Sequence, residues 1–128
     1  MNICELPEGI EIQRDFEREN MGKQNFNPIN LSDYTFYKIL LNSKETGFAS
    51  YRLRGANWYI DCFFIDENYR KKRLGTYLIK HIIKEMREQK NICIKIHPGK
   101  RQDLIMFLIK NNFKERDGDY LLSVESER

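Results

Sequence analysis

The sequence predicts an α/β (α+β) fold in which a mixed, mostly antiparallel central sheet carries helices on both faces and contains a central parallel strand pair. Three observations predict this fold. Residues 34–54 hold two runs of strand type around a turn, residues 58–86 pass from an apolar run through a basic turn into an amphipathic run, and residues 113–124 have a hairpin pattern. With 128 residues, 41% of them hydrophobic, the chain is expected to form a single domain, 1–128.

Composition excludes several classes of protein. No apolar stretch approaches the ~20 residues that a membrane span needs. The first twenty residues carry six acidic side chains, unlike a signal or transit peptide, so we expect a soluble, cytoplasmic protein with no membrane partner. Cys4, Cys62 and Cys93 are odd in number and widely spaced, which predicts neither a disulfide framework nor a metal site. Cys62 and Cys93 lie in apolar runs and are expected in the core.

Positive charge is concentrated in the middle of the chain. Residues 69–101 contain eleven Lys and Arg against two acids, a net charge of +9, so the remainder carries −6 if the whole carries +3. Such a segment suits a polyanion, either a diphosphate-bearing cofactor or a nucleic acid. Lys80, Lys84 and Arg87 are equally well explained as the solvated face of a helix.

The N-terminal part, 1–33, gives the weakest pattern. Ile3–Leu6 has the composition of a short strand, and Gln13–Asn20 that of a polar helix with few apolar anchors. A loop is expected after this helix, because Gly, Asn and Pro residues are frequent there.

Three consecutive strands are predicted next. Aromatic and branched residues fill Tyr34–Leu41, and Gly47–Arg54 alternates apolar with polar residues, as in a hairpin with one solvated face. Trp58–Ile65 is an apolar run interrupted only by Asp61. Such a run is typical of a central strand covered on both sides. Trp58 is expected to be a packing anchor at the start of that strand.

The remaining elements complete an α/β order. Apolar residues of 74–86 fall on one half of a helical wheel, which predicts a helix packed on the sheet. Ile92–Ile96 is expected to be a strand parallel to its predecessor, because a helical crossover connects them. Leu104–Ile109 favours a buried helix, and Phe113–Val124, with Asp117-Gly118 at its turn, favours a hairpin. That hairpin could offer a sheet edge to a second copy of the chain, which makes a homodimer possible.

A basic turn lies where the apolar run meets the amphipathic helix. The first-turn backbone N–H groups of a helix have no intrahelical partner, and the peptide dipoles add about half a positive charge there. Four consecutive cationic side chains add full charges, and Gly75 lets a ligand approach the backbone. These features predict a diphosphate-binding site.

Residues 66–78, DENYRKKRLGTYL, resemble the acetyl-CoA pyrophosphate loop of the GNAT superfamily of N-acetyltransferases. In that loop Arg or Gln, two variable residues, Gly, one variable residue and Gly follow a strand and open a helix. Arg70 matches the first position and Gly75 the last, whereas Arg73 replaces the middle Gly. The element order is similar to that of the family over residues 34–125.

The resemblance implies a cofactor site for acetyl-CoA (coenzyme A). Backbone groups of Phe63, Phe64 and Ile65 would pair with the pantetheine and polarise the thioester carbonyl. The pyrophosphate would be held by the loop, which comprises Arg70, Lys71, Lys72, Arg73, Leu74, Gly75 and Thr76.

The resemblance also implies direct attack of a primary amine on the thioester in a ternary complex, which needs a base, an oxyanion site and an acid for the thiolate. The family's general-acid Tyr is replaced by Leu108, the Gly that follows it by Asn112, and an earlier Asn by Arg101. The candidate catalytic residues are therefore Asp61 as base, with His97 and Tyr120 as other proton-transfer groups. Asp61 could instead bond a neighbouring strand, and His97 could be a loop residue.

Three functions are compatible with these observations. The first is an N-acetyltransferase that acetylates a primary amine of a small molecule, peptide or protein. The second is a GNAT-like acyl-CoA-binding domain with impaired catalysis. The third is a nucleic-acid-binding or nucleic-acid-modifying domain that uses the basic segment 69–101. Aromatic residues do not alternate with the basic residues in a base-stacking pattern, which argues against single-stranded nucleic acid as the main ligand.

Overall fold

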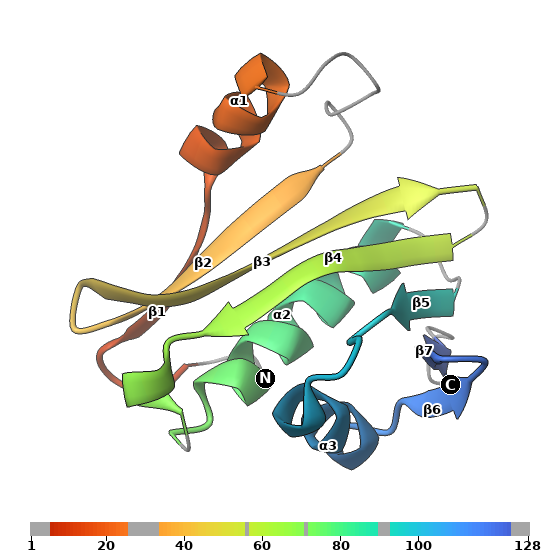
Figure 1. The fold of residues 1–128 in the computed structure, drawn as a ribbon. Helices are drawn as coiled ribbons and strands as arrows, with labels where there is room; N and C mark the ends of the chain where they lie inside the picture. The colour runs from red at the N-terminus through yellow and green to blue at the C-terminus, as the bar shows by residue number, and fades with distance from the viewer. Residues whose placement is uncertain (1–5, 26–33, 56, 71, 90–92, 124–128) are drawn as a thin grey trace.

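The computed structural model describes residues 6–25, 34–55, 57–70, 72–89 and 93–123 (Figure 1). These residues form a seven-stranded sheet with the strand order β1-β2-β3-β4-β5-β7-β6. Only β4 and β5 pair in parallel, so the expected mixed, mostly antiparallel sheet is confirmed. The elements are β1 Ile10–Arg14, α1 Phe16–Asn25, β2 Thr35–Leu41, β3 Lys44–Arg54, β4 Asn57–Ile65, η2 Glu67–Tyr69, α2 Leu74–Gln89, β5 Cys93–Ile96, α3 Gln102–Lys110, β6 Lys114–Arg116 and β7 Asp119–Ser123.

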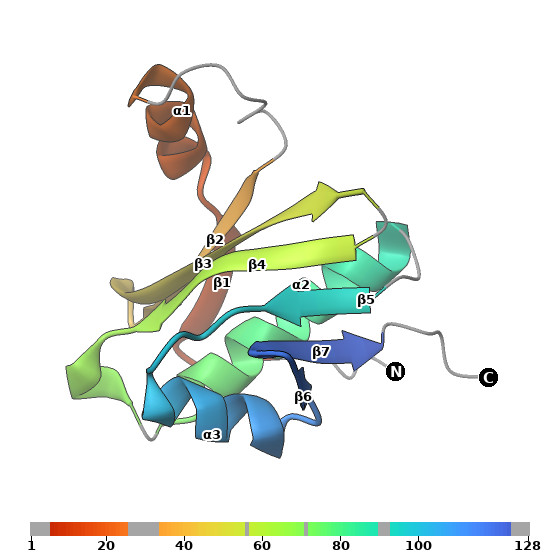
Figure 2. The same ribbon diagram turned by 45° about the vertical axis from the view of Figure 1, so that its right-hand side comes forward.

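The parallel pair is short, and its two strands then part. Asn57–Ile60 of β4 lies opposite Cys93–Ile96 of β5, where β5 ends. β4 continues to Ile65 and remains paired with β3. Figure 2 shows β5 turning away from β4 toward α3. The last five residues of β4, 61–65, therefore have one backbone edge that no described strand covers.

Helix α2 covers one face of the sheet, which we call the core face (Figures 1 and 2). Five apolar residues of this helix are at most 1% exposed: Leu74, Leu78, Ile79, Ile82 and Met86. Burying a side chain of this size contributes about 1.5–3 kcal/mol to folding. The sheet contributes Ile39, Ala49, Tyr51, Trp58, Ile60, Phe63 and Ile94 to the same core. Trp58 is thus the packing anchor that its place in the sequence predicts.

The other face of the sheet, which we call the outer face, is only partly covered. In β4, Trp58, Ile60, Phe63 and Ile65 are buried, whereas Asp61, Cys62 and Phe64 are exposed. The prediction that this strand is covered on both sides is therefore wrong, and so is the prediction of a core position for Cys62. Cys93 is half-buried, and Cys4 lies outside the described residues.

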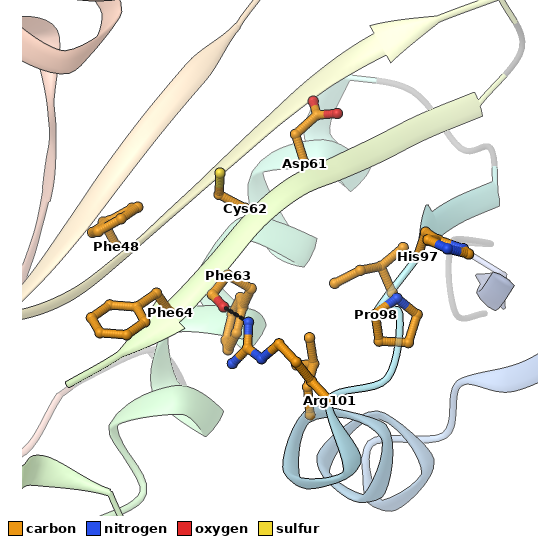
Figure 3. A pocket seen from close by; sticks show the side chains of 10 residues that line it. Phe48, Asp61, Cys62, Phe63, Phe64, His97, Pro98 and Arg101 are labelled. Carbon is orange, nitrogen blue, oxygen red and sulfur yellow. Dashed lines mark hydrogen bonds between the residues drawn. The ribbon is translucent and has the colours of Figure 1, made fainter. Parts of the chain in front are cut away.

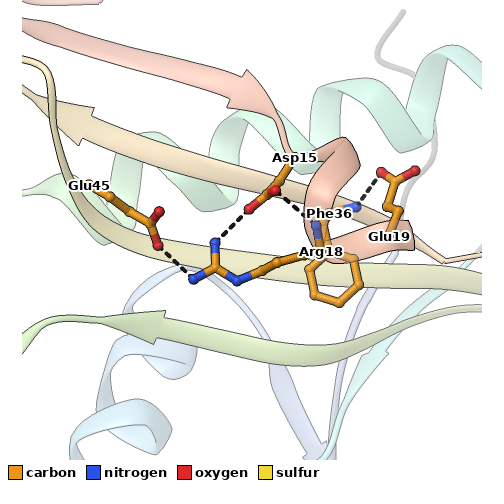
Figure 4. A network of polar contacts seen from close by, with 5 residues as sticks. All are labelled: Asp15, Arg18, Glu19, Phe36 and Glu45. Atoms are coloured by element: carbon orange, nitrogen blue, oxygen red, sulfur yellow. Dashed lines mark hydrogen bonds and ion pairs between the residues drawn. The ribbon is translucent and has the colours of Figure 1, made fainter. Parts of the chain in front are cut away.

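Helix α1 lies on the outer-face side and is held mainly by polar contacts. The Arg18 guanidinium lies 4.2 Å from the centroid of the Phe48 ring and donates to Glu45 Oε2 at 2.8 Å (Figure 4). Asp15, which is 3% exposed, accepts from the Arg18 backbone N–H and caps the helix. Glu19 accepts from the Phe36 backbone N–H at 2.9 Å. With α2 on one face and α1 on the other, the prediction of helices on both faces holds.

The N-terminal boundaries differ from those predicted. The first described strand is Ile10–Arg14, which was not predicted; of the predicted strand Ile3–Leu6, residues 3–5 lie outside the described residues. The helix begins at Phe16 rather than Gln13, because β1 pairs with β2 through Arg14 and Asp15 then caps the helix.

The hairpin turns between β2 and β3 and between β6 and β7 use left-handed residues. Asn42 and Ser43 have φ of 51° and 70°, so β2 and β3 are joined by a two-residue turn and β3 begins at Lys44. Asp117 and Gly118 have φ of 54° and 88° and form the predicted turn of the closing hairpin.

Helix α3 is amphipathic. The continuous apolar run in its sequence had predicted a buried helix. Leu104 and Leu108 are 6% and 0% exposed, whereas Met106 and Ile109 are 64% and 53% exposed. None of the helices in the described ranges combines the length and hydropathy that a membrane crossing requires.

We predict that Gly47→Ala lowers the free energy of unfolding by about 1–3 kcal/mol. A Cβ at residue 47 would lie 2.4 Å from the Phe64 carbonyl oxygen and 3.1 Å from the Ile65 Cα, so β3 and β4 would have to separate. Gly99→Ala is the control, since nothing lies within 4 Å of its Cβ and only its φ of +63° opposes the change. Urea unfolding measures both variants against the parent protein, and a Gly47→Ala variant as stable as the parent would contradict the close approach.

We predict that stability falls as the pH drops below about 6.5. Burial against Tyr37, whose ring centroid lies 4.7 Å from that of His81, lowers the pKa of His81. The imidazole of His81 then binds a proton more readily in the unfolded chain than in the folded one. The loss of stability therefore begins near the ordinary pKa of histidine and continues as the pH falls to the lowered pKa of the folded state. In His81→Phe the slope of unfolding free energy with pH should flatten, and an unchanged slope would refute this origin.

Candidate functional site

A pocket opens where β4 and β5 part, on the outer-face side of the sheet (Figure 3). The end of β4 forms one wall, and the loop from β5 to α3 forms the other. The lining residues are Phe48, Asp61, Cys62, Phe63, Phe64, Ile96, His97, Pro98, Arg101 and Leu104. Two of the predicted catalytic residues, Asp61 and His97, and two predicted cofactor contacts, Phe63 and Phe64, therefore lie in one pocket.

Two arginine side chains bind the uncovered backbone edge of β4. Arg101 Nη1 donates to the Phe63 carbonyl oxygen at 3.1 Å, and Arg70 Nε donates to the Ile65 carbonyl oxygen at 2.9 Å. Arg70 is in turn 3.2 Å from Asp103 Oδ2. These carbonyls face the gap between the strands and can accept hydrogen bonds from an extended ligand laid along β4.

The basic turn has a left-handed residue at the position where the resemblance expects the middle glycine. Arg73, in the place of the middle Gly, has a φ of 64°, and its carbonyl accepts the Tyr77 N–H at 3.1 Å. A left-handed non-Gly residue costs about 1–2 kcal/mol. The backbone N–H groups of Leu74, Gly75 and Thr76 have no partner among the described residues, so they can bind an anion. Lys72 and Arg73 are exposed, while Lys71 lies outside the described residues.

Asp61 is the extra residue of a β-bulge. Ser50 and Tyr51 of β3 pair with Cys62 and Ile60 of β4, which leaves Asp61 unpaired and turns its side chain toward the outer face. The side chain is 28% exposed, and its Oδ2 lies 3.3 Å from Arg52 Nε. Burial raises the pKa of Asp61, and the nearby Arg52 and Arg54 partly offset this. The residue therefore both lines the pocket and pairs with a neighbouring strand.

His97 and Tyr120 occupy different surroundings. His97 follows β5, its side chain is 70% exposed, and its Nδ1 lies 2.9 Å from Asp119 Oδ1. Tyr120 lies opposite Ile96 in the sheet, is 9% exposed in the core, and is not among the residues that line the pocket. Of the three predicted catalytic residues, His97 and Asp61 therefore line the pocket and Tyr120 does not.

The second helix of the site lacks a hydroxyl at the predicted acid position. Leu108 is 0% exposed and packs in the core. Asn112, in the place of the following Gly, has a φ of 74°, and the Phe113 N–H donates to the Leu108 carbonyl at 3.0 Å. Arg73 and Asn112 thus both retain the left-handed backbone of the glycines that they replace.

Sequence reasoning missed the side-chain positions of Arg101 and Arg52. The sequence analysis identified Arg101 only as a departure from a family Asn. Its place in the loop between a strand and a helix was a signal from which a contact with the site could have been predicted. The pairing of Arg52 with Asp61 depends on the bulge, which leaves no recognisable pattern in the sequence.

Comparison with known proteins agrees with this geometry. Residues 5–103 match the family model of the acetyltransferase (GNAT) family. No curated protein sequence matches the chain.

Several solved structures share the fold. The PaiA N-acetyltransferase of Thermoplasma acidophilum, in complex with coenzyme A, is 14% identical, with a TM-score of 0.67 and coverage of 88% of this chain and 96% of that one. The ribosomal-protein-S18-alanine N-acetyltransferase of Escherichia coli is 14% identical, with a TM-score of 0.67 and coverage of 93% and 96%. Naa50 of Arabidopsis thaliana, in complex with the bisubstrate analogue CoA-Ac-MVNAL, is 18% identical, with a TM-score of 0.66 and coverage of 93% and 99%.

The family model spans most of the chain, and the order of helices and strands is the one that the resemblance implied. The chain therefore belongs to the GNAT family of acetyltransferases.

Proposed function

We propose that the protein is an N-acetyltransferase that transfers the acetyl group of acetyl-CoA to a primary amine by direct attack in a ternary complex. The observation that carries this proposal is the uncovered edge of β4 together with the basic turn at the N-terminus of α2, which Arg70 joins through its hydrogen bond to the Ile65 carbonyl. An extended pantetheine arm would lie along the edge, and a diphosphate would lie at the turn.

The diphosphate end of this cofactor site depends on the backbone. The free N–H groups at the start of α2 would donate to phosphate oxygens, and the exposed Lys72 and Arg73 add charge. Arg70, which bonds the Ile65 carbonyl, joins this turn to the end of β4.

The pantetheine end depends on the uncovered carbonyl and N–H groups of β4. Hydrogen bonds to the backbone of Phe63 and Ile65 would hold the arm as an added strand. Binding would place the thioester between this edge and the loop that holds His97, with its carbonyl carbon open to the outer face.

The acceptor amine would approach from the outer face, where Phe48, Phe64 and Asp61 line the pocket. Asp61 would accept the ammonium proton, directly or through water, because its raised pKa makes it a better proton acceptor than an ordinary carboxylate. A small-molecule amine and a peptide or protein amine both fit this route. The similar structures of a ribosomal-protein-S18-alanine N-acetyltransferase and of Naa50 with the bisubstrate analogue CoA-Ac-MVNAL support including the latter.

We predict that acetyl-CoA and CoA raise the melting temperature of the protein. Ligand at about 100 times its Kd would stabilise the fold by about 2.7 kcal/mol. Arg73→Glu should abolish the rise by placing a negative charge against the pyrophosphate, whereas Lys114→Glu, the same charge change on β6, should leave it intact. Differential scanning fluorimetry measures the shift.

An undiminished shift in Arg73→Glu would contradict the proposed diphosphate site. If neither ligand shifts the melting temperature, while DNA or RNA binds in a strongly salt-dependent manner, the basic turn serves a nucleic acid instead.

We predict that Asp61→Asn lowers the rate of acetyl transfer to an amine by about 10²–10⁴-fold. The measurement is thiol release after an amine screen has found an acceptor. Acetyl-CoA binding should be unchanged in this variant, because the backbone of β4 is kept. If the rate at neutral pH is unaltered while transfer proceeds in the parent protein, Asp61 serves only its ion pair with Arg52.

A further inference from the structure

Arg101 is the one guanidinium among the residues that line the pocket. It precedes α3, and its side chain reaches across the strand gap to the Phe63 carbonyl oxygen, 3.1 Å from Nη1 (Figure 3). Within the described residues its side chain makes only this hydrogen bond. A guanidinium carries five N–H donors, so Arg101 can keep the bond to Phe63 and still direct other donors at a ligand in the gap.

The position that the resemblance gives to the general acid holds no proton donor. Leu108 has no hydroxyl and is fully buried, and Tyr120 lies on β7 and is not among the residues that line the pocket. His97 does line the pocket, with its Nδ1 engaged by Asp119 at 2.9 Å, so only its Nε2 is left for proton transfer. Arg101 places a permanent positive charge at the gap, which can stabilise an anion without any proton transfer.

We propose that Arg101 stabilises the departing CoA thiolate as an anion, so that acetyl transfer in this chain proceeds without a general acid at sulfur. This inference rests on the proposed function. The amine nitrogen forms the new bond to the acetyl carbon, the C–S bond breaks, and its electron pair stays on sulfur. The proton lost from the amine goes to Asp61 or to water.

The role of Arg101 is electrostatic. A guanidinium does not give up its proton in proteins, so it cannot act as the acid, but it forms short charge-assisted hydrogen bonds to an anion. The thiolate leaves the site unprotonated and takes a proton from solvent afterwards. A cation within about 4–6 Å favours ionisation of a thiol by tenfold or more at a given pH.

The ionisation of bound CoA tests this without knowledge of the acceptor. The ultraviolet absorbance of the thiolate is titrated with pH for CoA bound to the full chain, with the desulfo-CoA complex as the blank. Arg101→Gln removes the charge, Arg101→Lys keeps it without the fork of donors, and Lys100→Gln is the matched control, because Lys100 is an exposed neighbour outside the pocket lining.

The parent protein should hold about tenfold more thiolate than free CoA at a given pH. Arg101→Gln should lose this excess, Arg101→Lys should keep part of it, and Lys100→Gln should keep all of it. Desulfo-CoA should bind the parent and Arg101→Gln with similar affinity, because it lacks the sulfur.

Two results would overturn the inference while leaving the proposed function in place. One is an equal thiolate excess in the parent and Arg101→Gln. The other is a loss of desulfo-CoA affinity in Arg101→Gln as large as the loss of CoA affinity, which would assign Arg101 to another part of the ligand. If the parent binds neither CoA nor desulfo-CoA, the proposed function itself fails, and the inference with it.

Discussion

The parting of β4 from β5 is the constraint on which the rest of the structure depends. Four residues on each strand pair in parallel, and then β4 continues alone along its β5 side. Backbone carbonyls cannot remain unbonded at low cost, and here two arginine side chains bind those of Phe63 and Ile65. Both arginines come from the segments that bound the gap, namely the basic turn before α2 and the loop before α3. The same gap therefore fixes the position of the pocket, of the turn and of the predicted cofactor site.

The bulge at Asp61 determines which side chains of β4 point to the core face and which point to the outer face. Without the extra residue, the alternation of the strand would continue unbroken and turn the side chains at one end of β4 to the opposite face. With it, Ile60 and Phe63 both reach the core while Asp61 and Cys62 both reach the outer face. A carboxylate thus stands beside the gap at no expense to the packing against α2.

The sequence predicts the elements with strong periodicity, and it fails where tertiary contacts decide. Helix α2 was predicted from the helical period of its apolar residues, the parallel pair from the helical crossover between its strands, and the closing hairpin from the turn residues Asp117-Gly118. Burial of both faces of β4 was wrong because Cys62 and Phe64 are apolar in type yet point to the outer face. The strand Ile10–Arg14 was not predicted because its pairing with β2, not its composition, makes it a strand.

The candidate site was predictable to a similar extent. The basic turn could be found because its function rests on charge and on a helix N-terminus, both of which are local in sequence. The conformation of Arg73 could not, because a left-handed Arg has no sequence signature. The contact of Arg101 with Phe63 joins residues 38 positions apart and depends on how α3 docks, which no local pattern encodes.

Helix α1 is attached to the sheet in a different manner from α2. Carboxylates and guanidiniums, Asp15, Arg18, Glu19 and Glu45, make most of its contacts, and Arg18 extends over the Phe48 ring, which itself lines the pocket. Ion pairs at a partly exposed surface weaken with salt, whereas the apolar packing of α2 does not. The pocket wall at Phe48 is therefore supported separately from the hydrophobic interior, so its sequence can change with a smaller cost to the packing of α2 against the sheet.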